Sequence, residues 1–191
     1  NEFLNKNYDW ISEKDRNLLI KTTGVKKKRQ APLGMTSSDL CLASAEQLIS
    51  DLSWDKDSID ALIFLSQSPD YYLPATSVIL QHKLGLKNTT MAFDIGLGCS
   101  GYVYGLQIAS SLINGEGIKR VLLLVGDVST ATCAYTDKST FPLFGDAGTA
   151  TALEYAPKSD SFSFELFSDG EGYESIIIED GGRIEGSVNI T

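Results

Sequence analysis

The stretch FDIGLGCSGYVYGLQIASSLI, residues 93–113, places a cysteine at the corner between two predicted elements. The apolar residues before the corner predict a buried strand over 89–95, and the long apolar segment after it predicts a helix over 99–114. Glycines flank Cys99 on both sides, as a sharp turn from strand to helix requires. The corner therefore combines one thiol with a nearly bare backbone.

Working outward from this corner, strands and helices alternate along the chain. Short apolar runs predict buried strands at 61–66, 89–95 and 120–127, with helices between them at 75–85 and 99–114. Two earlier helices are predicted: one starts at Ser12, runs to Lys21 or Thr22 and stops at Gly24, and the other covers 38–52. This order is typical of an α/β fold with a mostly parallel sheet covered by helices. Three later strand-like segments predict an antiparallel extension of the sheet: 149–155, 161–168 and 174–180.

The position of Cys99 favours a chemical role. In α/β sheets, ligands gather at the carboxyl ends of the strands, and Cys99 follows one of them. It also falls at the first turn of the next helix, whose free N–H groups and dipole favour an anion by up to ~2 kcal/mol. A thiolate nucleophile is one interpretation, and an inert buried cysteine is the other. For Cys41, in a predicted amphipathic helix, and Cys133, in a loop, we favour the inert interpretation.

Composition excludes several classes of function. The 191 residues include 16 basic and 25 acidic ones, for a net charge of −9, so we expect no nucleic-acid binding. Three cysteines at irregular spacing and a single histidine, His82, predict neither a metal site nor a disulfide framework. Reduced thiols favour a cytoplasmic location. No apolar run is long enough for a membrane span, so we expect no membrane partner.

Five segments carry a resemblance to a known family. AFDIGLGCSGYVYGL (92–106) resembles the nucleophile segment of β-ketoacyl-acyl carrier protein synthase III, in the thiolase-fold superfamily. The other segments agree with that family in order and spacing: TTGVKKKRQA (22–31), SQSPDYYLPATSVILQHKLGL (66–86), FPLFGDAGTATALE (141–154) and SDGEGYESIII (168–178). Each motif is weak alone, but together they span nearly the whole chain.

The resemblance implies a fold and an activity. It implies that residues 1–191 form a single N-terminal thiolase-like domain, with a mixed, mostly parallel five-stranded-type sheet that lacks its first strand. An acyl group from a thioester would be loaded on Cys99 and condensed with malonyl-acyl carrier protein, in fatty acid or related lipid or polyketide biosynthesis. The family's catalytic His and Asn lie in a second half that is absent here, so we expect no condensation by this chain alone. Coenzyme A and acyl carrier protein thioesters are substrates rather than cofactors, and the resemblance implies a homodimer.

Four further residues match substrate-binding positions of the family. Leu73 matches a residue that closes the partner's acyl pocket, and Phe144 is an expected pocket wall; core packing is the alternative for both. Thr22 and Lys138 stand where the family has arginines, and Leu18 stands where it has an aromatic residue that helps to hold the nucleotide. Without a planar guanidinium, adenine binding is weaker. We therefore expect a carrier-protein thioester donor, or a coenzyme A ester held differently.

Two other functions stay open. One is a thiolase-fold acyltransferase with a non-malonyl acceptor, and the other is a non-catalytic half-domain that only dimerises. Cys99 and its glycine turn argue against the second, because nothing structural demands a thiol there. A cysteine hydrolase would need a histidine near the thiol. His82 is instead expected on the exposed face of a helix.

Overall fold

The computed structural model describes residues 12–159 and 162–178. Its helices are α2 (Glu13–Thr23), α3 (Ser37–Asp51), α4 (Thr76–Leu84) and α5 (Gly101–Leu112). Its strands are β1 (Ala61–Leu65), β2 (Met91–Ile95), β3 (Arg120–Val128) and β4 (Asp146–Glu154). Short 3-10 turns occur at Lys56–Ser58, Ser129–Ala131 and Tyr173–Ser175.

The four strands form one sheet in the order β2-β1-β3-β4. β1 is parallel to both of its neighbours, with Ala61 opposite Met91 on one side and Val121 on the other. β4 runs antiparallel to β3. The prediction of a mostly parallel sheet with an antiparallel extension is confirmed for the segment at 149–155.

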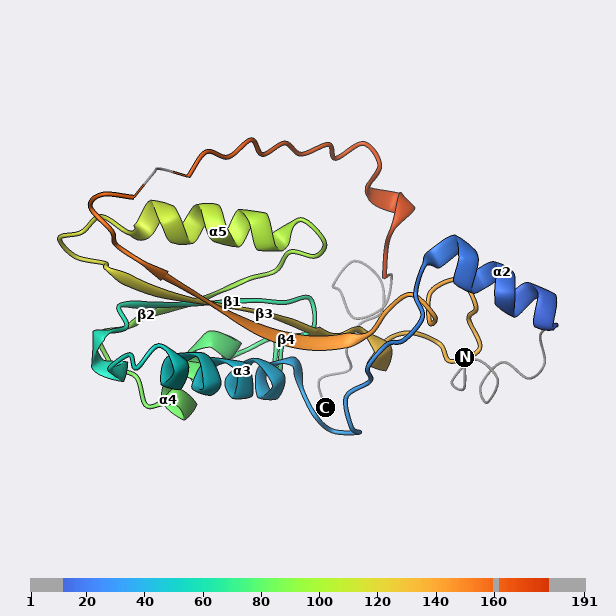
Figure 1. Ribbon diagram of the computed structural model, residues 1–191, viewed down its shortest axis with the longest axis horizontal. Helices are drawn as coiled ribbons and strands as arrows, with labels where there is room; N and C mark the ends of the chain where they lie inside the picture. Colours follow the sequence, from blue (N-terminus) through green and yellow to red (C-terminus); the bar gives the residue numbers. More distant parts are fainter. Residues whose placement is uncertain (1–11, 160–161, 179–191) are drawn as a thin grey trace.

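Helices cover both faces of the sheet (Figure 1), with α3 and α4 on one side and α5 on the other. Successive residues of β1 point to opposite faces, so Leu62 and Phe64 pack with α3 and α4, while Ile63 packs in the core that contains Ala109 of α5. All five residues of β1 are buried. This continuous apolar run is the pattern of a strand covered on both faces.

The ends of the first helix follow from local sequence. The Ser12 side chain accepts a hydrogen bond from the Asp15 N–H and caps the start of α2. The helix ends at Gly24, which has a φ of 71° and is therefore left-handed. The predicted helix is thus confirmed with Ser12 as its cap and Gly24 as its stop, and it extends to Thr23 rather than ending at Lys21 or Thr22.

Two of the predicted strands are wrong. Residues 162–168 run as an extended segment over α5 (Figure 1) and are not paired as a strand. Residues 173–175 form a 3-10 turn, so the described part of 174–180 is not a strand either. A strand exists only where a neighbouring backbone accepts and donates its hydrogen bonds. Here 162–168 is held to α5 mainly by side chains, with Tyr104 donating to the Phe167 carbonyl at 3.1 Å. Residues 161, 179 and 180 lie outside the described residues.

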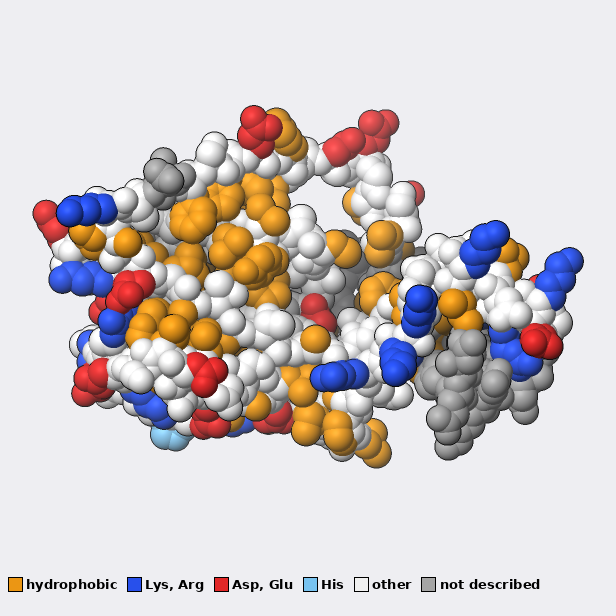
Figure 2. All heavy atoms as spheres, in the orientation of Figure 1, with side chains coloured by type: hydrophobic (Ala, Val, Ile, Leu, Met, Phe, Trp, Pro, Cys, Tyr) orange, Lys and Arg blue, Asp and Glu red, His pale blue; other side chains and the backbone are white. Residues whose placement is uncertain are grey.

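Apolar side chains gather over α5 in Figure 2, where Tyr102 and Val103 are exposed. Among the described residues, no helix is long and apolar enough to cross a membrane. Within the same part of the chain, no three His, Cys, Asp or Glu side chains converge as a metal site.

Candidate active site

Cys99 lies between the end of β2 and the start of α5, and its thiol is free and exposed. We expected it in the first turn of the helix, but the helix begins at Gly101, so Cys99 lies in the turn immediately before it. The Gly101 N–H donates to the Gly98 carbonyl at 2.8 Å and closes this turn. Ser100, the N-cap residue, makes no side-chain capping bond. The amino end of α5 is thus left without a side-chain cap beside the thiol.

Cys99 differs sharply from Cys41, which is fully buried in α3. Burial raises the pKa of the Cys41 thiol to about 12. Cys133 is half-buried in a loop, as the sequence predicts. The alternative interpretation of Cys99 was an inert, buried cysteine. The structure has such a cysteine at Cys41 and not at Cys99.

Glycines in α5 allow the helix to approach the sheet closely. A Cβ atom at Gly101 would lie 2.6 Å from Cδ2 of Leu65, at the end of β1. One turn later, a Cβ at Gly105 would lie 3.0 Å from Cδ1 of Leu123 in β3. Close packing on the two central strands fixes the start of α5, and with it the position of Cys99, relative to the sheet.

Two carboxylates that the sequence analysis missed organise the loops around this corner. Asp127, near the end of β3, accepts hydrogen bonds from the Gln67 and Ser68 N–H groups at 2.7 and 3.1 Å. Asp94 of β2 accepts from the Thr76 and Ser77 N–H groups at 2.7 and 2.8 Å. Asp94 therefore caps α4 from a neighbouring strand. An acidic residue near the carboxyl end of an apolar strand was the available signal for both.

Leu73 and Phe144 are both exposed rather than packed in the core of this chain. Leu73, in the loop before α4, is 85% exposed, and Phe144, just before β4, is 43% exposed. The core-packing alternative for these residues is therefore wrong within the described chain. Their role in an acyl pocket stays a prediction.

Thr22 and Lys138 belong to the end of the molecule where α2 and the segment after β3 meet (Figure 1). Thr22 lies in the last turn of α2, where its hydroxyl donates to the Leu18 carbonyl at 2.9 Å. Lys138 is exposed in the loop between β3 and β4. That loop is anchored to α2 by buried Phe141, which packs with Leu19 and Ile20. The hydroxyl proton of Thr22 is thus used within α2.

Basic residues gather near α2 in Figure 2. One of them, Lys28, packs over the Phe141 ring at 3.5 Å from its centroid and donates to the Phe141 carbonyl. Burial lowers the pKa of Lys28. The Lys26–Arg29 cluster is therefore partly structural, while Lys26, Lys27 and Arg29 are exposed.

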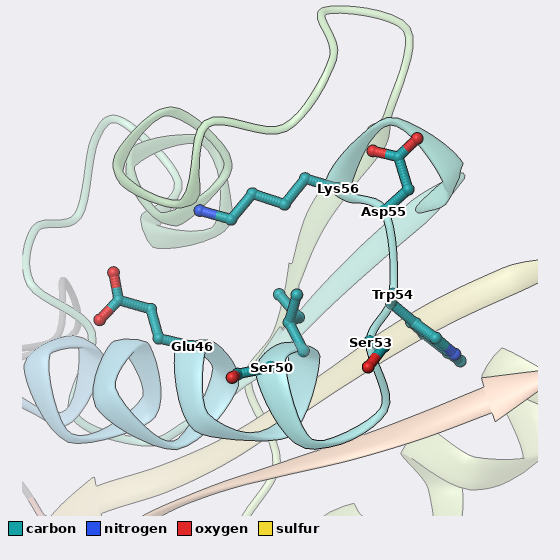
Figure 3. A pocket seen from close by; sticks show the side chains of 7 residues that line it. Glu46, Ser50, Ser53, Trp54, Asp55 and Lys56 are labelled. Atoms are coloured by element: carbon teal, nitrogen blue, oxygen red, sulfur yellow. The ribbon is translucent and has the colours of Figure 1, made fainter.

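A cavity of about 520 Å³ lies at the opposite end of the sheet from Cys99. Glu46 and Ser50 of α3 line it together with Trp54, Asp55 and Lys56, which precede β1 (Figure 3). Because β1 and β2 are parallel, the start of β1 is remote from the end of β2. This cavity is therefore separate from the candidate site.

His82 is exposed on α4, as expected.

Comparisons with known proteins relate this chain to one family of enzymes. Residues 93–170, which include the Cys99 corner, match the sequence family described as 3-Oxoacyl-[acyl-carrier-protein (ACP)] synthase III. By sequence and by fold, the chain is related to the 3-oxoacyl-ACP synthases III. A β-ketoacyl-ACP synthase III of Aliarcobacter butzleri is 36% identical over 181 residues, which are 93% of this chain and 54% of that protein.

Solved structures give the same result. A 3-oxoacyl-ACP synthase of Burkholderia xenovorans has a TM-score of 0.85 and 39% identity, covering 95% of this chain and 51% of that chain. A structure described as 3-oxoacyl-ACP synthase III has a TM-score of 0.89 and 34% identity, covering 99% and 56%. The chain thus spans about half the length of the synthase III proteins that it matches. The mixed α/β, thiolase-like fold is confirmed.

Proposed function

We propose that this chain supplies the nucleophile of a 3-oxoacyl-ACP synthase III. The Cys99 thiolate attacks the carbonyl carbon of an acyl thioester. A new C–S bond to Cys99 forms, the C–S bond to the donor breaks, and the donor leaves as its thiolate. The acyl group is then held on Cys99 until a carbon nucleophile removes it.

One observation carries this proposal: an exposed free thiol stands at the uncapped amino end of a 12-residue helix, at the carboxyl end of a parallel strand. The helix dipole and free N–H groups there stabilise an anion, either the thiolate or the oxyanion that forms when it attacks. The surrounding segment is the part of the chain that matches the synthase III family.

Condensation needs groups beyond this corner. Malonyl-ACP loses carbon dioxide, and the carbanion left behind attacks the acyl carbon, forming a C–C bond while Cys99 leaves as a thiolate. The enolate in this step needs hydrogen-bond donors. The sequence has one histidine, His82, which is exposed on α4 away from the Cys99 corner. We therefore propose that the chain alone accepts an acyl group without condensing it, and that a second half of the enzyme supplies the missing groups.

We also propose a donor of the acyl group and the partners of the chain. Leu18 and Thr22 offer neither an aromatic face nor a free planar cation to a nucleotide, which supports a carrier-protein thioester as donor. The exposed Lys26, Lys27 and Arg29 suit an acidic carrier protein. Leu73, with 85% of its surface exposed, suits a contact with a second copy in a homodimer. A cytoplasmic location stays a prediction.

Acyl loading tests the function directly. The 191-residue chain is incubated with octanoyl-coenzyme A or octanoyl-ACP, and the mass of each cysteine-bearing peptide is measured. We expect the octanoyl mass on Cys99 only, faster from the carrier protein, and none in Cys99→Ala. Octanoylation of Cys133 at the same rate, or none at Cys99 from either donor, would contradict the proposal.

A second assay separates the alternatives. Loaded chain is mixed with malonyl-ACP, and the 3-oxoacyl product is sought by mass spectrometry. We expect none. Turnover would show that the chain is sufficient for condensation and contradict the proposed need for a second half. Transfer of the acyl group to another thiol or amine acceptor would instead support an acyltransferase without a malonyl substrate.

A further inference from the structure

We propose that Gln67, held in place by Asp127, is a positioning residue for Cys99. The importance of Gln67 for catalysis depends on the function proposed above, whereas its position beside Cys99 is independent of that function. The contact that carries this role is made at Gly98, the residue immediately before Cys99.

Gly98 is in direct contact with the side-chain amide of Gln67. A Cβ atom at Gly98 would lie 2.5 Å from Oε1, 2.8 Å from Cδ and 3.0 Å from Nε2 of Gln67. The amide therefore occupies the space that any other residue at position 98 would fill. Gly96, two residues earlier in the same turn, has nothing within 4 Å of the corresponding point. A Cβ at position 98 would thus displace the Gln67 amide, the far end of a flexible side chain, and would not meet backbone.

Gln67 is fixed at its backbone. Its N–H donates to Oδ1 of Asp127 at 2.7 Å, and the next N–H, of Ser68, donates to the same oxygen at 3.1 Å. The Ser66 and Ser68 hydroxyls donate to it as well, at 3.0 and 3.1 Å. One carboxylate oxygen on β3 therefore gathers the whole turn that follows β1.

The turn is also tied to the strand that leads to Cys99. The Ser66 N–H donates at 3.2 Å to the carbonyl of Ile95, which is the last residue of β2. From there the chain continues through Gly96 and Gly98 to Cys99. The bond to Ile95 and the contact at Gly98 thus both link the turn after β1 to the segment that leads to Cys99. Asp127 is therefore linked to the segment that carries Cys99 at Gln67 and also at Ser66.

The Gln67 contact bears on how close the Cys99 sulfur stays to the amino end of α5. In the described part of the chain the Cys99 thiol is free, and Ser100 provides no cap. The effect of a helix amino end falls off within about one turn. A turn that moves freely would carry the sulfur out of that range for part of the time. The Gln67 contact restricts that movement.

Alkylation of the native 191-residue chain by iodoacetamide tests the inference without any acyl donor. The rate at each cysteine is read by mass spectrometry between about pH 5 and about pH 9. For Gln67→Ala we expect a rate at Cys99 about three- to tenfold lower near neutral pH, the range that corresponds to a partial loss of the helix contribution. The alkylation rate of Cys133 should stay unchanged over the same pH range.

Two double-mutant cycles separate this role from a general loss of stability. Gly98→Ala should slow the alkylation of Cys99, because the added methyl group displaces the Gln67 amide. In a chain that already carries Gln67→Ala, it should have little further effect on that rate. Asp127→Ala should likewise add nothing to Gln67→Ala, while Asp127→Asn, which keeps an acceptor oxygen, should retain part of the rate. Gly96→Ala is the matched control and should alkylate as the wild type does. Melting curves confirm that each variant is folded.

A wild-type rate and pH profile in Gln67→Ala would overturn the inference. Effects of Gly98→Ala and Gln67→Ala that multiply would overturn it as well. If Asp127→Ala does not fold, the Gln67 and Gly98 cycle decides alone. Coupled alkylation without acyl loading would leave the positioning role intact and reject the proposed function. Acyl loading with uncoupled alkylation would do the reverse.

Discussion

At the scale of single residues, the three cysteines occupy three different environments. Cys99 is exposed, Cys133 is half-buried, and Cys41 is fully buried. The sequence predicted the position of Cys99 between a strand and a helix, because that is a local pattern, while its catalytic role stays a prediction. It could not predict the contact between Gln67 and Gly98, because that contact joins residues far apart in the chain.

Alkylation should distinguish Cys41 from Cys99. Burial raises the pKa of Cys41 to about 12, so at about pH 9 only ~0.1% of this thiol is ionised. We expect iodoacetamide to label Cys99 in the native chain and to leave Cys41 unmodified. Labelling in denaturant is the control, since unfolding should make both thiols reactive. Equal labelling rates in the native state would contradict the buried position of Cys41.

Asp39 should make α3 sensitive to acid. Its carboxylate accepts a hydrogen bond from the Thr36 N–H in a capping box, which lowers the pKa of Asp39 below its ordinary 3.8. The ionised form is favoured in the folded state, so its contribution to stability is present above the unfolded pKa and is lost as pH falls through the folded pKa. Asp39→Asn should therefore be less stable than wild type near pH 7. Urea titrations should show this difference shrinking in acid, and a difference independent of pH would refute the assignment.

At the scale of elements, the bounds of α2, α3 and α4 were all predicted closely, but the residue that caps α4 was not. α2 and α3 carry their own caps, Ser12 and Thr36, and their limits were predicted closely. α4 has Ala75 as its N-cap residue and no local side-chain cap. Its cap is Asp94, which comes from a strand later in the sequence.

Removing the charge of this distant cap should destabilise the fold. Asp94→Asn keeps the shape but weakens two hydrogen bonds to backbone N–H groups, and we expect a loss of about 1–2 kcal/mol in the free energy of unfolding. Asp51→Asn is the matched control, because Asp51 is exposed and bonds only to Gln47 on the same helix among the described residues. Its expected effect is below about 0.5 kcal/mol. Equal losses in both variants would refute the capping role of Asp94.

The contact between α3 and β4 should tolerate no added atom. A Cβ at Gly148 would lie 2.5 Å from backbone atoms of both Leu40 and Cys41. Backbone cannot yield as a flexible side chain can, so Gly148→Ala should cost at least about 1–3 kcal/mol. Gly170→Ala, which meets nothing within 4 Å, is the control for the substitution itself. Denaturant unfolding gives both values, and a neutral Gly148→Ala would mean that α3 is not packed on β4 as described.

At the scale of the whole molecule, the layered architecture followed from the order of strands and helices. Three apolar runs separated by two helices are enough to predict parallel pairing with helical cover. The antiparallel strand at 149–155 was also correct. The two later strands failed because alternation of apolar and polar residues shows that a segment can be a strand, but not that a partner backbone is available.

Hydrogen exchange should reveal this difference. Backbone amides of β1 pair with two neighbouring strands and should exchange slowly, whereas 162–168 is extended without strand pairing and should exchange close to the unprotected rate. The measurement is amide exchange by mass spectrometry on the intact chain, with β4 as the internal reference for a strand at the edge of the sheet. Protection at 162–168 equal to that of β4 would restore the strand that the sequence predicted.

The pairing of β1 also sets an order of events during synthesis. This central strand pairs with β2 and with β3, and β3 is complete only at Val128. A ribosome that has released residues only as far as Leu112 exposes β1 with one side unpaired and with apolar side chains ready to aggregate. The growing polypeptide is therefore most dependent on chaperones between the emergence of β1 and that of β3, and a translational pause placed in this interval would lower the yield of folded protein.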